Sequence, residues 1–81
     1  MADEGMILFH CRLRPRRISL FRFLLEGYDG LATLSTESAA LGLVACRTPV
    51  ARGREAAALL GCLCRRGILS SYLREGSGHG G

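Results

Sequence analysis

The amino-acid sequence predicts an α+β fold with strands and helices in the order β-α-β-β-α-β. Two periodicities lead to this order. Apolar residues alternate with polar ones over residues 7–13 and 31–36, which is the spacing of a strand with one buried side. Over residues 16–27 and 49–66 apolar residues recur every three or four positions, which is the spacing of an amphipathic helix.

A proline separates the first strand from the first helix. The residues on the expected inner face of the strand are Ile7, Phe9, Cys11 and Leu13. Pro15 ends this strand, because proline has no amide hydrogen for a sheet ladder but is accepted in the first turn of a helix. The helix from residue 16 is expected to expose Phe23 and to bury the stripe Ile18, Phe21, Leu24, Leu25 and Tyr28.

A glycine turn and a polar break follow this helix. Gly27 and Gly30 supply the backbone freedom that ends the helix and leads into a strand over residues 31–36. The polar residues 37–40 are expected to form a hairpin turn. Residues 41–47, reading LGLVACR, are almost continuously apolar, which predicts a central strand covered on both sides or nearly so.

The second helix is expected to begin at Thr48 and Pro49, which suit a cap and a first helical turn. Its apolar stripe is Ala56, Leu59, Leu60 and Leu63. Gly67 is expected to stop the helix, because glycine readily adopts the left-handed conformation found at helix ends. The last strand is then expected over residues 68–74.

This element order predicts a ferredoxin-like arrangement, because each pair of strands joined through a helix needs a crossover and the middle pair forms a hairpin. Both helices are expected on one face of a four-stranded antiparallel sheet, with the first and third strands central. The 81 residues leave room for a single domain, expected over residues 6–75. Residues 1–5 and 76–81 are expected to be flexible tails.

The basic residues are all arginine, and 11 of them against 7 acidic residues give a net charge of +4. Arginine grips phosphates and carboxylates with a planar fork, so the cluster Arg12, Arg14, Arg16 and Arg17 is a candidate nucleic-acid site. The alternative is that these arginines only solvate the surface. Ferredoxin-like sheets that bind RNA stack bases on exposed aromatic residues, and Phe9 is expected on the inner face, so the arginines alone carry this hypothesis.

A candidate site for a small ligand lies at the end of the first helix. Glu26, Tyr28 and Asp29 could offer two carboxylates and a phenol there. The alternative interpretation is that Asp29, between two glycines, only shapes the turn.

Four residues are candidates for an interface between proteins. Leu8 and Val44 are expected on the sheet face opposite the helices, His10 on the same face, and Phe23 on the outer side of its helix. Exposed apolar side chains on small domains often mark association, so a homodimer or a complex with another protein is expected.

No pattern in the sequence indicates an enzyme or a cofactor. It contains no Ser-His-Asp arrangement and no phosphate loop. Cys62 and Cys64 lie two positions apart on a helix and would point about 200° away from each other, so they cannot grip one metal ion. Cys11 and Cys46 are expected as buried free thiols. The acidic start MADEG is unlike a signal peptide and no apolar span follows, so a cytoplasmic location is expected, with no membrane contact.

The segment FRFLLEGYDGLATLST, residues 21–36, resembles a small bacterial family of uncharacterised domains in which a helix ending in Leu-Glu-Gly-Tyr leads through a glycine turn into a strand. That family is a domain of unknown function, so the resemblance implies no activity. By element order the chain is also similar to amino-acid-binding regulatory (ACT-like) domains, whose ligands lie at helix turns and dimer interfaces.

Overall fold

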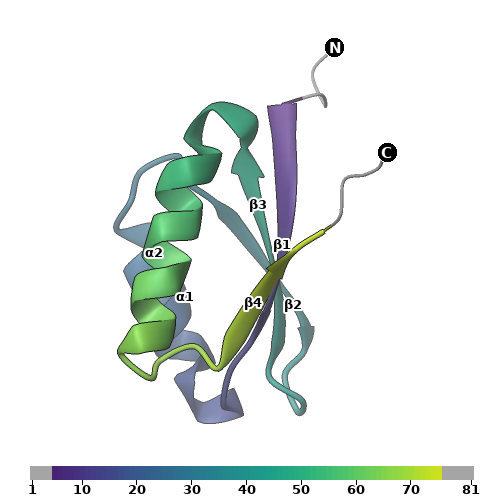
Figure 1. Cartoon of the computed structure of the whole chain (residues 1–81). Coiled ribbons are helices and arrows are strands. Elements are labelled where there is room, and N and C mark those ends of the chain that lie inside the picture. The colour runs from purple at the N-terminus through teal and green to yellow at the C-terminus, as the bar shows by residue number, and fades with distance from the viewer. Residues whose placement is uncertain (1–4, 76–81) are drawn as a thin grey trace.

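The computed structural model describes residues 5–75 and has the predicted element order (Figure 1). The elements are β1 (Met6–Arg12), the short 3-10 helix η2 (Pro15–Arg17), α1 (Ile18–Glu26), β2 (Thr33–Ser38), β3 (Leu43–Pro49), the 3-10 helix η3 (Val50–Arg52), α2 (Gly53–Arg65) and β4 (Ser71–Arg74). The strands form one antiparallel sheet in the order β2-β3-β1-β4, with β1 and β3 in the centre. The prediction of an α+β ferredoxin-like fold is confirmed.

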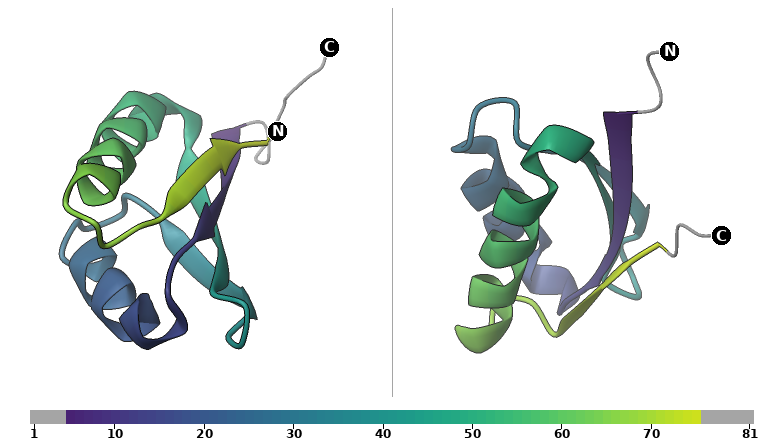
Figure 2. Two further views of the ribbon diagram at one scale, coloured as in Figure 1. Left: turned by 60° about the horizontal axis from the view of Figure 1, so that its bottom comes forward. Right: turned by 45° about the horizontal axis from the view of Figure 1, so that its top comes forward.

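Both helices lie on the same face of the sheet and leave the other face uncovered (Figure 2). The alternation expected for β1 is confirmed, because Ile7, Phe9 and Cys11 are buried while Leu8 and His10 between them are half-buried. Leu13 is also buried, just beyond the end of β1. The hydrophobic core therefore occupies the layer between the sheet and the helices.

The helices contribute to this core along most of the stripes that the sequence predicts, but the expected burial of Tyr28 is wrong, because Tyr28 lies beyond the end of α1 and is 44% exposed. Phe21 and Leu25 of α1 are fully buried, whereas Phe23 of the same helix has 72% of its surface exposed. In α2 the buried members of the stripe are Ala56, Leu60 and Leu63, with Leu59 partly buried. Burial of these side chains is the main force that holds α1 and α2 against the sheet.

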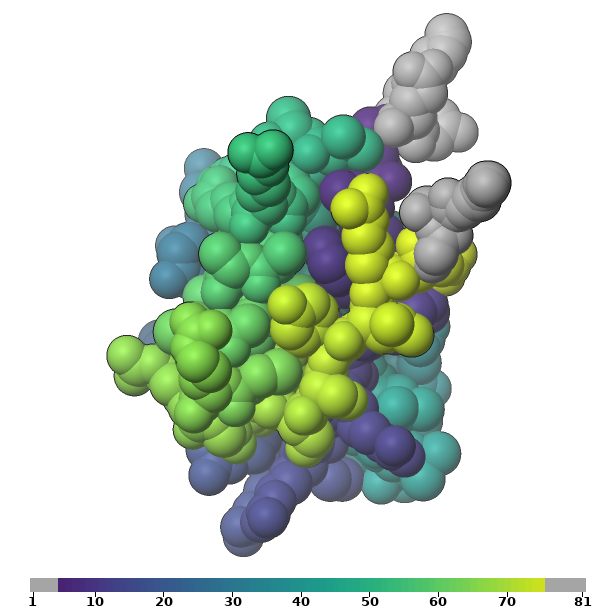
Figure 3. Space-filling model, viewed as in Figure 1, coloured from purple at the N-terminus to yellow at the C-terminus, as the bar shows by residue number. Residues whose placement is uncertain are grey.

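Strand β4 closes the core on the side of α2. Side chains of α2 and β4 lie next to each other on the surface of the molecule (Figure 3). Tyr72 of β4 packs edge-on against Phe9 of the neighbouring strand β1, with ring centroids 6.2 Å apart and an interplanar angle of 61°. Leu69 precedes β4 and is buried in the same core.

The expected start of the second helix is wrong. Thr48 and Pro49 belong to β3, where they pair with Ile7 and Met6 of β1. The side chain of Thr48 points into the core, and its hydroxyl lies 3.9 Å from the Cys46 sulfur instead of capping a helix. The ladder with β1 thus extends the strand, and α2 begins only after the 3-10 turn η3.

The predicted hairpin between β2 and β3 is present, with its turn displaced along the chain. Strand β2 continues to Ser38 through an irregularity in its pairing with β3, and the turn occupies residues 39–42. The amide of Gly42 donates to the carbonyl of Ala39 at 3.2 Å, and the Ser38 hydroxyl accepts from the Leu41 amide at 3.2 Å. Gly42 closes the turn with a φ of 71°, in the left-handed region.

The two predicted tails fall almost entirely outside the described residues, since only residue 5 of the segments 1–5 and 76–81 is described. Within residues 5–75, neither helix has the length and apolarity that a membrane crossing requires.

Candidate functional site

The turn that follows α1 is tied to the start of α2 by Arg52. Its Nη1 donates to the backbone carbonyl of Asp29 at 2.6 Å, while Nε and Nη2 donate to the two carboxylate oxygens of Glu55, each at 3.0 Å. These hydrogen bonds lower the pKa of Glu55 and raise that of Arg52. Gly30 has a φ of 71° within the turn. The backbone of this segment therefore serves the fold, as expected for a glycine-flanked aspartate.

The structure brings one of the three predicted ligand residues to a cleft. Glu26, Tyr28 and Asp29 are all exposed. Of the three, only Tyr28 lines a cleft that runs between α1 and α2. The small-ligand hypothesis is therefore best tested at this interhelical cleft, with Tyr28 as the residue that connects it to the sequence prediction.

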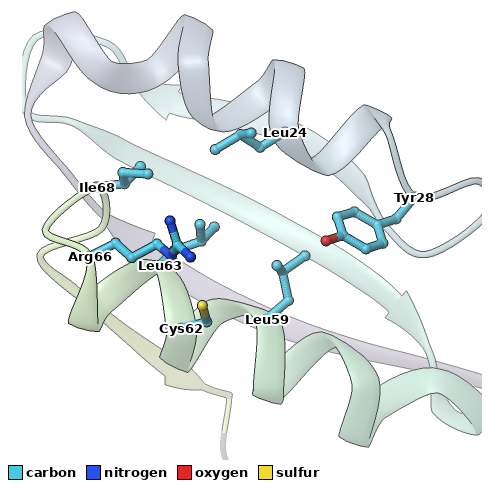
Figure 4. A pocket seen from close by; sticks show the side chains of 7 residues that line it. All are labelled: Leu24, Tyr28, Leu59, Cys62, Leu63, Arg66 and Ile68. Atoms are coloured by element: carbon cyan, nitrogen blue, oxygen red, sulfur yellow. The ribbon is translucent and has the colours of Figure 1, made fainter.

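The interhelical cleft has a volume of about 250 Å³ and is lined by Leu24, Tyr28, Leu59, Cys62, Leu63, Arg66 and Ile68. In Figure 4 the side chains of α1 and α2 face each other across an apolar gap, with the Cys62 sulfur directed into it. The Tyr28 hydroxyl enters from one end and the Arg66 guanidinium from the other. The arrangement combines apolar walls with one phenol and one positive charge.

Arg66 owes its position to the turn that ends α2. Its amide donates to the carbonyl of Cys62 at 3.0 Å, and the amide of Gly67 donates to that of Cys64 at 3.0 Å. Gly67 has a φ of 79° and stops the helix as predicted. The chain then reverses, so that Ile68 folds back and its amide donates to the carbonyl of Leu63 at 3.0 Å. Sequence reasoning placed Arg66 near the helix end but did not show that it turns into a cleft.

The sheet face opposite the helices, here called the open sheet face, carries apolar and charged side chains in adjacent rows. Leu8 pairs with Arg47 of β3 and lies beside Glu75, whose amide donates to the Leu8 carbonyl at 2.8 Å. In the next row Ala45, His10 and Leu73 lie side by side on β3, β1 and β4. Leu73 is the most exposed apolar member, with 68% of its surface accessible.

His10 lies near the middle of the open sheet face between two carboxylates. Its Nε2 is 2.8 Å from Glu75 Oε1, and its Nδ1 is 3.8 Å from Glu37 Oε1. The imidazole therefore connects the edge strand β2 with the end of β4. This local negative charge makes the face less suited to a polyanion than the net charge of the chain suggests.

The prediction that Val44 lies on the open sheet face is wrong. Val44 pairs with Cys11 across the β1–β3 ladder and shares its inward orientation, so that only 1% of its surface is exposed. Of the other predicted interface residues, Leu8 and His10 lie together on the open sheet face. Phe23 lies on α1, on the opposite side of the sheet, and cannot join them in one flat interface.

The four candidate nucleic-acid residues lie along the segment between β1 and α1, at the lower end of Figure 1. Arg12, Arg14 and Arg16 are exposed and Arg17 is half-buried. Within residues 5–75, no carboxylate lies within ion-pair distance of any of the four. Phe9 of the central strand is buried, as predicted, so it cannot stack on a base.

Comparison with known proteins gives a family. A family model described as "Domain of unknown function (DUF4911)" matches residues 11–65. The chain belongs to this family. No curated protein and no solved structure matches the chain. The resemblance seen at residues 21–36 is thus confirmed at the level of a domain of unknown function.

The DUF4911 match contains the four candidate arginines and covers part of the interhelical cleft and of the open sheet face. It spans α1, β2, β3 and α2, and so includes Leu24, Tyr28 and Leu59 of the interhelical cleft. Leu8 and His10 of the open sheet face precede the match, and β4 follows it. The family segment therefore carries both helical walls of the cleft but only part of the open sheet face.

The four cysteines of this DUF4911 domain are all free. Cys11 and Cys46 are buried on the central strands, and burial raises the pKa of both thiols. The pKa of Cys11 rises to about 12, and the nearby Cys46 and Cys64 add smaller contributions to this increase. Cys62 and Cys64 are half-buried. Among residues 5–75, no three His, Cys, Asp or Glu side chains are grouped so that they could hold a metal ion.

The buried thiol of Cys11 is expected to make stability fall in alkaline solution. Its pKa is about 12 in the folded chain and about 9.0 when solvated, so between these values the unfolded state loses a proton that the folded state keeps. The stabilising contribution of the protonated Cys11 thiol is fully present below pH 9. Its loss should decrease the free energy of unfolding by about 2–4 kcal/mol as pH rises to 12. Urea denaturation over this pH range measures the effect.

Two variants separate this thiol from other groups that titrate in the same range. Cys11→Ala should reduce the dependence of stability on pH and leave the part that the buried Cys46 contributes. Cys62→Ala should retain the full dependence, because Cys62 is half-buried and faces the interhelical cleft. Equal slopes for the parent chain and Cys11→Ala would show that Cys11 does not cause the alkaline loss.

Proposed function

We propose that this chain is a non-enzymatic binding domain that acts as a homodimer through its open sheet face. The observation that carries the proposal is the pairing of apolar and oppositely charged side chains on that face. Leu73 and Leu8 supply apolar surface, and exposed apolar residues on a small domain often mark association. We further propose a cytoplasmic location, supported by the four free cysteines.

The charges on the open sheet face suit a second copy of the same chain. A two-fold interface brings each patch against itself, so it is favourable only when the patch contains charges of both signs. Arg47 lies next to Leu8, and Glu37 and Glu75 lie on either side of His10. Rotation of a second copy can therefore place Arg47 of one chain near a glutamate of the other.

The same charges weigh against nucleic acid on this face, because two carboxylates next to the central strand repel phosphates. The similarity in element order to ACT-like regulatory domains agrees with a binding or regulatory role.

The homodimer predicts a mass of twice the chain mass of 8.7 kDa at high micromolar concentration. Leu73→Glu should shift the dimer to the monomer, with an increase of about tenfold or more in the dissociation constant, because it places a charge at the apolar part of the interface. Size-exclusion chromatography with light scattering over a concentration series measures the change.

Phe23→Glu is the matched control, because Phe23 is equally exposed but lies on α1, away from the open sheet face. It should leave the mass unchanged. A monomeric parent chain at high micromolar concentration would refute the homodimer. If the chain instead shifts RNA or DNA at low salt, and Arg14→Gln with Arg16→Gln abolishes the shift, nucleic-acid binding replaces the present proposal.

A further inference from the structure

The interhelical cleft has a chemical character that the proposed dimer does not use. Its walls are aliphatic, with Leu24 from α1 facing Leu59 and Leu63 from α2. Ile68 closes the end near Arg66, and the Tyr28 ring closes the other end. A cleft of this kind removes an apolar molecule from water on two sides and so favours its binding.

Arg66 adds a specific electrostatic element to the cleft. Its guanidinium points into the apolar gap. Among residues 5–75, no carboxylate lies within ion-pair distance of Arg66, and its guanidinium donates no hydrogen bond to these residues. Arg52 provides a contrast, because Glu55 neutralises it with two hydrogen bonds. Arg66 therefore retains its capacity to grip an anion at the border of an apolar surface.

We propose that the interhelical cleft binds a small carboxylic acid with an apolar body. The body lies between Leu24 and Leu59, and the carboxylate accepts hydrogen bonds from the Arg66 guanidinium. The net charge of +4 assists the approach of such an anion. Tyr28 limits the length of the body at the far end, and its hydroxyl can donate to a polar atom there.

The size of the cleft sets the size of the ligand. Its volume of about 250 Å³ is below the roughly 300–1,000 Å³ of clefts that hold drug-sized molecules. A chain of about eight carbons, or one aromatic ring with a short acidic arm, matches this space better than a long-chain lipid or a nucleotide. Octanoate is therefore a suitable probe.

The decisive experiment is a titration of the full chain with octanoate, in which binding is measured by amide chemical shifts or by calorimetry. Saturable binding is expected, with shifts concentrated at Leu24, Tyr28, Leu59 and Arg66. Octylamine has the same chain but the opposite charge, and it should bind about tenfold more weakly or worse. Octanol serves as the uncharged reference and should lie between the two.

A pair of adjacent arginines provides the matched variants. Arg66→Gln should weaken octanoate binding by about tenfold and leave octanol binding unchanged, because only the carboxylate uses the guanidinium. Arg65→Gln removes the same net charge from an exposed position that does not line the cleft, so it should have little effect. Both residues are exposed, so neither substitution should disturb folding.

Several results would overturn the proposal. One is the absence of saturable octanoate binding at low millimolar concentration, and another is equal affinity for octanoate and octylamine. A third is an equal loss of octanoate affinity in Arg66→Gln and Arg65→Gln. Cys62→Trp, which fills the cleft, should abolish binding while circular dichroism shows a folded chain, and retained binding would place octanoate elsewhere. The Leu73→Glu variant should bind octanoate like the parent chain, so the cleft and the dimer can fail separately.

Discussion

Replacement of Gly42 with alanine is expected to lower the free energy of unfolding by about 3 kcal/mol or more. Gly42 has a φ of 71°, a conformation that costs an alanine about 1–2 kcal/mol. In addition, the new Cβ would overlap the backbone carbonyl oxygen of Leu13, which no side-chain rotation can move away. The same contact places the Leu13 amide 2.9 Å from the Gly42 carbonyl, so relief of the overlap would break this hydrogen bond.

Gly67→Ala is the matched control for this effect. Gly67 also has a left-handed backbone, with a φ of 79°, but apart from its own residue and its two chain neighbours no atom lies within 4 Å of the position of an added Cβ. The decrease in the free energy of unfolding of Gly67→Ala should therefore be limited to the conformational cost of about 1–2 kcal/mol. Urea denaturation of the three proteins gives the difference. Equal decreases in the free energy of unfolding of the two variants would show that the overlap of the new Cβ with the Leu13 carbonyl adds nothing to the loss in Gly42→Ala.

Gly42 also illustrates why the hairpin could be only partly predicted. Residues 37–40 are polar and mark a break between strands, which is a local property that the sequence displays. The end of the turn depends on where β3 starts to pair with β1, and Leu43 pairs with Arg12. Register of this kind is a property of the assembled sheet. The strand expected from the sequence therefore begins at residue 41, two residues before β3, and wrongly includes Gly42.

The orientation of β3 was missed for a related reason. In β1 polar residues alternate with apolar ones, so the buried face can be read directly from the sequence. In β3 three consecutive residues, Val44, Ala45 and Cys46, are all buried, although the helices cover only one face of the sheet. Ala45 lies on the open sheet face, where its small side chain is flanked by His10 of β1 and Ser35 of β2. A continuous apolar run does not show which of its residues face the core. Only the pairing with Cys11 of β1 shows that Val44 points inward.

The candidate site shows the same division between local and tertiary information. Tyr28 could be selected because it is the last residue of the predicted apolar stripe and borders a glycine turn. Arg66 could not, since its direction depends on the reversal of the chain after Gly67 and on the packing of α2 beside α1. Leu59 and Leu63 were predicted as core residues, and the structure shows that they also line the interhelical cleft.

The other large effect is expected at Phe21, whose side chain is fully buried in the middle of α1. Phe21→Ala should reduce the free energy of unfolding by about 3–5 kcal/mol, because it removes an aromatic ring from the core and leaves a cavity. In a chain of 81 residues this is a large part of the total stability. Chemical denaturation with circular dichroism would show a lower midpoint, or an unfolded chain at room temperature.

Phe23→Ala tests whether this loss arises from burial and not from the change of residue type. Phe23 is two positions further along the same helix, has the same side chain, and is 72% exposed. Its replacement should change the free energy of unfolding by less than about 0.5 kcal/mol, and the higher helix propensity of alanine offsets part of any lost contact. A loss at Phe23 as large as that at Phe21 would mean that Phe23 is covered in solution. The surface of α1, and not the open sheet face, would then be the place to look for the dimer contact.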